Sequence, residues 1–177
     1  MGSVKIINFD TTIFIILKIG IENMNTNLPN LKLSIELVPE TVWCKNLRNN
    51  VSKSVWDTIR FNCYNKYQNK CRICGKDGRL DCHEIWAYDD EKHIQKLLGF
   101  VALCKDCHNI KHIGRSGILA EQGKLDFGHL IDHFCQVNNC SKSEFNQYYK
   151  QAFAQWHERS QYQWQLDFGE YADKIKK

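Results

Sequence analysis

Residues 71–112 decide the fold of this chain: CRICGKDGRLDCHEIWAYDDEKHIQKLLGFVALCKDCHNIKH. The stretch contains two Cys-x-x-Cys pairs, Cys71/Cys74 near its start and Cys104/Cys107 near its end. Two such pairs supply the four thiolates that a tetrahedral zinc requires, so the spacing predicts a structural Zn²⁺ site. A disulfide or redox pair is the alternative, but no thioredoxin-like βαβ pattern surrounds these cysteines. We therefore expect the zinc to close the intervening residues into a loop.

A second set of metal-binding side chains lies inside the same stretch. His108 and His112 are four residues apart, so on a helix they project from one face, about 6 Å apart, and can share one ion. His83 and Glu84 lie in RLDCHEIW, which reads as a strand, where successive side chains face opposite sides. Both can face the ion only if a bulge or strand end separates them. One of the two is therefore expected to be a ligand, and the other a base or a supporting group.

The pattern Cys-x-x-Cys, His-Glu-Ile and Leu-Cys-x-x-Cys-His-x-x-Lys-His resembles the HNH endonucleases, also called the His-Me finger or ββα-metal family. The resemblance covers residues 71–115. It implies a β-hairpin followed by a helix, wrapped around one divalent catalytic ion. The expected strands are residues 80–86 and 100–103. The expected helix begins near Cys104 and ends by Gly114, a natural residue to follow a helix.

The resemblance also implies roles for individual residues. The ligands of the catalytic ion would be His83, His108 and His112. Both His83 and Glu84 count as catalytic, because Glu84 falls where the family has its general base. A register shifted by one residue instead makes His83 the base and puts Cys82 in the ligand position. Gly99 stands where the family has an asparagine.

Phosphodiester hydrolysis calls for such groups. A divalent ion polarises the phosphate and stabilises the leaving oxygen, and a base takes the proton of the attacking water. A histidine-rich site suits Zn²⁺, Ni²⁺ or Mn²⁺ as well as Mg²⁺. Three basic residues near the predicted ligands are expected to contact nucleic acid, namely Lys105, Lys111 and Arg115.

Charge and cysteine usage agree with this interpretation. The 177 residues carry a net charge of +4, which suits a nucleic-acid partner, most simply DNA. Nine cysteines without a recognisable secretory signal predict a reducing, cytoplasmic compartment. The apolar run Thr11–Ile21 is shorter than the about 20 residues of a membrane span, so no membrane association is expected.

The chain divides into four expected parts. These are an irregular or β-rich N-terminal extension at 1–38, a helical flank at 39–70, the nuclease core at 71–115 and a C-terminal helical region at 116–177. The expected fold class is α+β and mostly helical, with a central ββα-metal finger held by a four-cysteine zinc between N-terminal and C-terminal helices.

Helix signals are clear in both flanks. Apolar residues recur every four positions between Val55 and Tyr67, and Ser52 or Ser54 could cap that helix. Ser141 and Glu144 form a capping box before a helix with an aromatic face. Trp43 and Trp56 are expected in the core. His129 and His133 are also four apart, and we expect them on a helix surface.

Two functions fit these patterns. The first is a metal-dependent HNH endonuclease that nicks or cleaves DNA. The second is a non-catalytic zinc module with four cysteine ligands that binds nucleic acid or protein. The first is favoured because a binding module has no need of His83, Glu84, His108 and His112 beside four cysteines.

Overall fold

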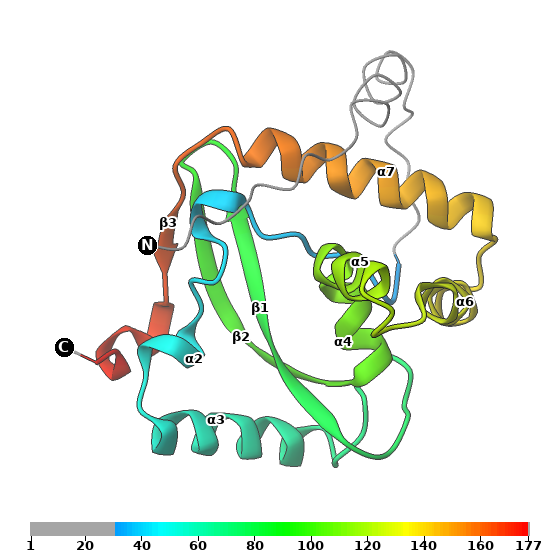
Figure 1. The fold of residues 1–177 in the computed structure, drawn as a ribbon. Coiled ribbons are helices and arrows are strands. Elements are labelled where there is room, and N and C mark those ends of the chain that lie inside the picture. Colours follow the sequence, from blue (N-terminus) through cyan, green and yellow to red (C-terminus); the bar gives the residue numbers. More distant parts are fainter. Residues whose placement is uncertain (1–30, 177) are drawn as a thin grey trace. The chain divides into compact units, whose positions relative to one another are not determined.

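The structure, a computed structural model, describes residues 31–176, and the predicted extension at 1–30 lies outside the described residues. The described chain is α+β and about half helical (Figure 1). Its elements follow in the order η2 (Glu40–Val42), α2 (Leu47–Asn50), α3 (Lys53–Lys66), β1 (Leu80–Asp89), β2 (Ile94–Cys104), α4 (Lys105–Lys111), α5 (Ile113–Glu121), α6 (Phe127–Asn138), α7 (Lys142–Arg159), β3 (Gln165–Asp167) and η3 (Gly169–Lys174).

The long hairpin of β1 and β2 is the centre of the fold. The strands pair antiparallel from Leu80 opposite Cys104 to Asp89 opposite Ile94, and β3 adds a short parallel edge beside β2. Both strands are longer than the sequence predicted. The apolar and aromatic residues on each side of the acidic turn continue the pairing to the turn itself.

A bulge interrupts the hairpin after Ile85. Ile85 pairs with Gly99, but the next residue, Trp86, pairs with Leu97, so Leu98 is left as the extra residue. Gly99 has a φ of 149°, which side-chain-bearing residues rarely adopt. This backbone geometry gives a physical reason for glycine at the position where the HNH pattern has asparagine.

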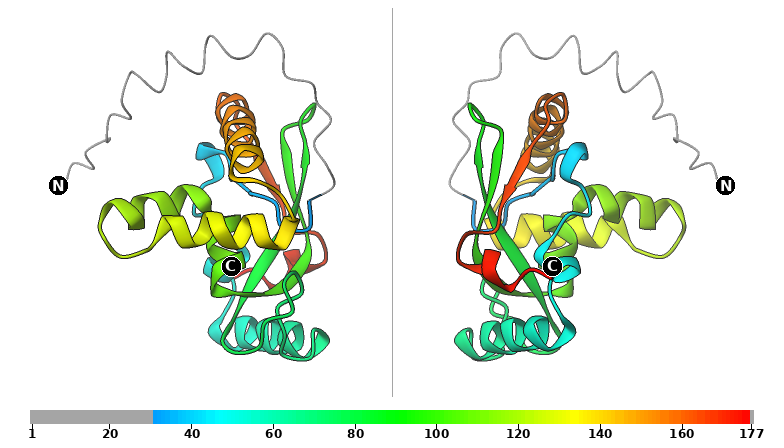
Figure 2. Two further views of the ribbon diagram at one scale, coloured as in Figure 1. Left: turned by 90° about the vertical axis from the view of Figure 1, so that its right-hand side faces the viewer. Right: turned by 90° about the vertical axis from the view of Figure 1, so that its left-hand side faces the viewer.

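The hairpin packs against different elements on its two faces. One face contributes Ile85 and Val101 to a core shared with α4, α6 and α7. The other face contributes Phe100 and Ala102 to a second core, shared with α2 and α3. Figures 1 and 2 show α3 near one end of the hairpin and α7 near its turn. The sheet thus lies between two cores, which share only Tyr67 and Leu80 among the described hydrophobic residues.

Residues 31–38 belong to the first core, although the sequence placed them in the N-terminal extension. Leu33 and Ile35 are buried there. Asn138 at the end of α6 bonds to Leu33 twice, donating to its carbonyl at 2.9 Å and accepting from its N–H at 3.0 Å. This segment is therefore an integral part of the described unit.

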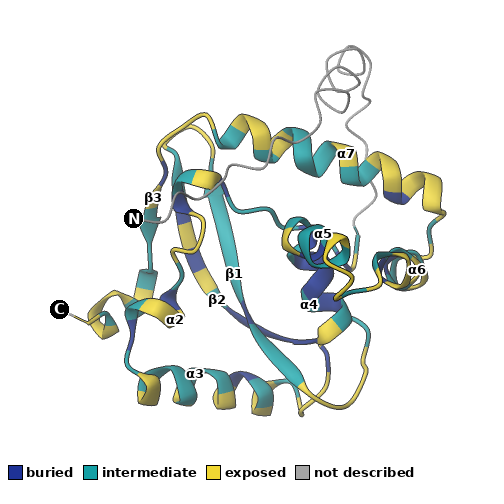
Figure 3. Ribbon diagram, viewed as in Figure 1, coloured by how far each residue is buried: buried dark blue, intermediate teal, exposed yellow. Residues whose placement is uncertain are grey.

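The helix signals in the flanks are confirmed. Ser52 caps α3 by accepting from the N–H of Val55, and Ser141 and Glu144 form the predicted capping box at the start of α7. The aromatic face of α7 packs on α6, where Phe145 contacts Phe134 at 5.0 Å between ring centroids. Figure 3 shows that buried residues are concentrated in β2 and α4.

Two details differ from expectation. Gly114 does not end the helix after the second cysteine pair. α4 stops at Lys111, His112 leaves helical geometry, and Gly114 lies inside α5. Trp43 is 61% exposed because the turn after η2 buries Val42 and directs Trp43 outward. None of the helices between residues 31 and 176 has the length and apolar character needed to cross a bilayer.

Because α6 packs on α7 through Phe134, removing the Phe134 ring should destabilise the protein strongly. Phe134 is 1% exposed, so Phe134→Ala should lower the free energy of unfolding by about 3–5 kcal/mol, through lost apolar burial and a residual cavity. Urea denaturation measures this change. Phe61→Ala on the surface of α3 is the matched control, and it should change stability by no more than about 0.5 kcal/mol.

Candidate metal centre

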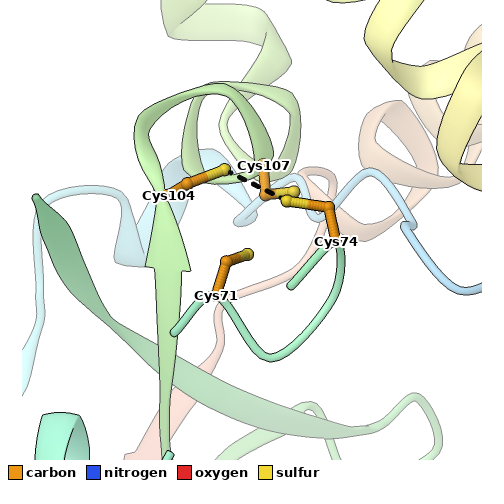
Figure 4. Close-up of side chains that lie close together, drawn as sticks. All are labelled: Cys71, Cys74, Cys104 and Cys107. Atoms are coloured by element: carbon orange, nitrogen blue, oxygen red, sulfur yellow. Dashed lines mark hydrogen bonds between the residues drawn. The ribbon is translucent and has the colours of Figure 1, made fainter. Parts of the chain in front are cut away.

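The four predicted cysteines come together at one end of the hairpin (Figure 4). Cys71 and Cys74 lie in the turn before β1, while Cys104 ends β2 and Cys107 lies in the first turn of α4. Their sulfur atoms all lie within 4.8 Å of one another, and those of Cys74 and Cys104 are 3.5 Å apart. Sulfurs bound at about 2.3 Å to a tetrahedral zinc would be about 3.8 Å apart. The four thiols could therefore hold a metal such as zinc.

Hydrogen bonds within the cluster favour the metal-binding thiolate form at one of its members, Cys71. Hydrogen bonds from the thiols of Cys104 and Cys107 lower the pKa of Cys71. All nine cysteines of the chain are free thiols, in agreement with a metal site rather than a disulfide. The cluster ties the turn before β1 to the junction of β2 and α4.

One histidine outside the predicted set reaches this cluster. Nε2 of His133 on α6 lies 3.3 Å from the sulfur of Cys107, and burial lowers the pKa of His133. A neutral imidazole can donate an N–H bond to a thiolate and so reduce its excess negative charge. The neighbouring His129 is exposed, with its Nε2 3.5 Å from Asp106. Of the two histidines expected on the surface of α6, only His129 is there.

The three predicted histidines form a second, separate cluster. His83 comes from β1, His108 from α4 and His112 from the residue that ends α4. One nitrogen from each lies within 4.8 Å of the others, and the ring centroids are 4.7–5.4 Å apart. The strand supplies one imidazole and a single helical turn supplies two, as the four-residue spacing predicted.

The surroundings of this cluster favour the neutral form of His83 and His112. His83 is 5% exposed, and burial lowers its pKa. Burial, aided by the two neighbouring imidazoles, lowers the pKa of His112 to about 3. Neutral imidazole is the form that coordinates a metal, because the ligand nitrogen must be free of a proton.

Two carboxylates that the sequence did not single out lie beside the histidines. Oδ2 of Asp81 on β1 is 3.2 Å from Nδ1 of His108, which is buried and has no well-oriented hydrogen-bond partner among residues 31–176. The imidazole of His108 lowers the pKa of Asp81. Oε2 of Glu36 is 2.9 Å from Nε2 of His83. Metal-binding histidines commonly have a carboxylate partner of this kind.

Glu84 is separated from the cluster by the sheet. Its carboxylate accepts a 2.9 Å bond from the N–H of Leu47 at the start of α2, and burial raises its pKa. The extra residue of the bulge after Ile85 is Leu98 on β2, so alternation along β1 is unbroken and His83 and Glu84 face opposite sides. Cys82, the ligand in the shifted register, lies on the same face as Glu84 and interacts with Cys63. Of the two predicted catalytic residues, the structure therefore places only His83 in the histidine cluster.

The three predicted nucleic-acid contacts fall in different surroundings. Lys105 and Arg115 are exposed. Lys111 is 7% exposed, because its ammonium pairs with Glu36 and donates a 2.8 Å bond to the hydroxyl of Ser34. The expectation that Lys111 meets a phosphate is wrong for this reason.

A cavity of about 160 Å³ lies beside Glu36, the carboxylate partner of His83. Glu36 lines it together with Trp86, Tyr88 and Arg159. Arg159 lies over the Tyr88 ring at 4.2 Å and forms a two-point ion pair with Asp90 at the hairpin turn. The side of Glu36 that faces away from His83 is thus partly open.

Glu36, Asp81 and His133 were missed because each lies apart from the pattern that identifies its partners. Only Asp81 could have been found from the sequence. It is two residues before His83 on the predicted strand, so the two side chains face the same side of β1. Glu36 and His133 are distant in sequence and depend on tertiary packing. The chain matches no protein-family model, no curated protein and no solved structure.

Proposed function

We propose that this protein is a metal-dependent HNH endonuclease that hydrolyses phosphodiester bonds of DNA. The observation that carries the proposal is the second donor cluster, formed by His83, His108 and His112, beside a hairpin that leads directly into a helix. A module that only binds has no use for three clustered imidazoles in addition to four thiols. In this proposal β1, β2 and α4 form the ββα-metal finger.

The two clusters would then hold two ions with different purposes. The four cysteines would bind a structural zinc, which fixes the start of β1 to the start of α4. The three histidines would bind a divalent ion such as Mg²⁺, Mn²⁺, Ni²⁺ or Zn²⁺. Such an ion supplies charge stabilisation at the phosphate and activation of water when it is bound.

The chain itself would supply orientation and charge. Asp81 places a negative charge 3.2 Å from Nδ1 of His108, and Glu36 bonds to Nε2 of His83. Lys105 and Arg115 are the exposed cations close to the histidine ligands in sequence, and we assign them to phosphate contacts. The buried position of Glu84 assigns it to packing between β1 and α2, not to catalysis.

Removing a histidine of the cluster should abolish cleavage without unfolding the chain. We expect His108→Ala to reduce the rate of nicking of supercoiled plasmid by at least about 100-fold, because the ion loses a ligand and its charge stabilisation. Agarose gels with Mg²⁺, Mn²⁺, Ni²⁺ and Zn²⁺ measure the rate. His129→Ala, an exposed histidine on α6, is the control. Cleavage by His108→Ala at the wild-type rate would favour the non-catalytic module instead.

Removing a cysteine of the thiol cluster should destabilise the whole finger. Cys71→Ser is expected to lose bound zinc, since the binding free energy of a structural zinc is part of the folding free energy. A loss of about 3 kcal/mol corresponds to a fall in Tm of roughly 6–12 °C, and we expect at least this. Elemental analysis and a thermal melt test the prediction, with the exposed Cys44→Ser as control. An unchanged melt would contradict the structural role.

The contact between His133 and Cys107 predicts a smaller effect on the same ion. His133→Ala should release zinc to a coloured chelator about 10-fold faster, because the thiolate loses its N–H donor. His133→Gln, which keeps a donor, should release it at an intermediate rate. His129→Ala should match the wild type, and equal release by all four proteins would remove any role for His133.

A further inference from the structure

The histidine cluster has a neighbour that comes from outside the finger. Glu36 lies in the segment before η2, 47 residues from His83 in sequence, and its carboxylate lies between His83 and Lys111. The ammonium of Lys111 pairs with Oε1 of Glu36, and Nε2 of His83 lies 2.9 Å from Oε2. A carboxylate that is paired with a lysine ammonium in this way accepts hydrogen bonds as the charged form.

An ionised carboxylate can only accept hydrogen bonds, and this fixes the proton on its partner. Oε2 of Glu36 lies 2.9 Å from Nε2 of His83, so the hydrogen must be on Nε2 of the neutral imidazole. The other nitrogen, Nδ1, then has a free lone pair. Only this tautomer of His83 offers Nδ1 to an ion while keeping its bond to Glu36.

The carboxylate is held in place from several directions. The N–H of Glu36 donates a 3.0 Å bond to the carbonyl of Lys111, and the ammonium of Lys111 pairs with Oε1. Ser34 gives that ammonium a second partner at 2.8 Å. Ile35, next to Glu36, is buried in the core. These contacts leave the Glu36 side chain little freedom to move away from His83.

We propose that Glu36 is a positioning residue of the histidine site, which holds His83 as the Nε2–H tautomer with Nδ1 turned toward the divalent ion. The inference rests on the proposed function, because it assumes that the three histidines bind an ion. It adds that the site needs a residue of the segment at 31–38, outside the residues that resemble the HNH family.

Replacing Glu36 with glutamine gives a sharp test, because the ammonium of Lys111 decides how the new amide is oriented. Lys111 can only donate, so the amide oxygen must face it and the amide NH₂ must face His83. Nε2 of His83 would then have to accept, and its proton would move to Nδ1. Glu36→Gln thus keeps the shape of the side chain but blocks the nitrogen that the ion needs.

The experiment uses the full chain loaded with one equivalent of zinc, into which Co²⁺ is titrated by calorimetry. We expect Glu36→Gln to bind Co²⁺ about 10–100-fold more weakly than the wild type, while zinc content stays unchanged. Glu36→Asp, which keeps the charge, should recover part of the affinity. Glu40→Gln, a change at an exposed glutamate four residues further on, should bind Co²⁺ like the wild type.

The tautomer can also be measured without any variant of Glu36. Nitrogen-15 spectra of the metal-free wild type, with the His83 signals identified by their loss in His83→Gln, should show the hydrogen on Nε2. A hydrogen on Nδ1 would overturn the proposal, as would wild-type Co²⁺ affinity in Glu36→Gln. Failure of the proposed function looks different: His108→Ala would then bind Co²⁺ as well as the wild type.

Discussion

Alternation of side chains along β1 determines which residues meet on each face of the sheet. Odd-numbered residues from Asp81 to Ile85 face the core that contains α4, and even-numbered residues face α2 and α3. Because the extra residue of the bulge, Leu98, lies on β2, alternation along β1 is unbroken beside the histidine cluster. His83 and Asp81 therefore join the helix histidines, and Glu84 serves the opposite face.

The same constraint explains how far the sequence could predict the site. Spacing was sufficient to identify the two cysteine pairs and the pair of His108 and His112 as candidate ligands. The members of each pair lie within one turn of the chain. The choice between His83 and Glu84 depended on which face of β1 packs against α4, which a single sequence does not reveal. It required the strand register that the structure provides.

In the helical flanks, too, local features could be predicted from the sequence and long-range contacts could not. Capping residues such as Ser52 and Ser141 act on backbone groups three residues away, so helix starts could be predicted well. Long-range contacts could not. Nothing local to residues 31–38 indicates that Glu36 meets His83, or that His133 on α6 meets Cys107. Trp43 was placed in the core on residue type alone, and the turn that exposes it depends on the burial of Val42.

The paired bonds between Asn138 and Leu33 bear on how the protein can be shortened. A fragment that contains only the hairpin and α4 would lack the segment at 31–38, which shares their core. Such a fragment would expose the apolar side of α4, including Ile110, which is fully buried in the intact protein. Transplanting this unit into another scaffold would require carrying along chain from well before the first cysteine pair and from beyond α6.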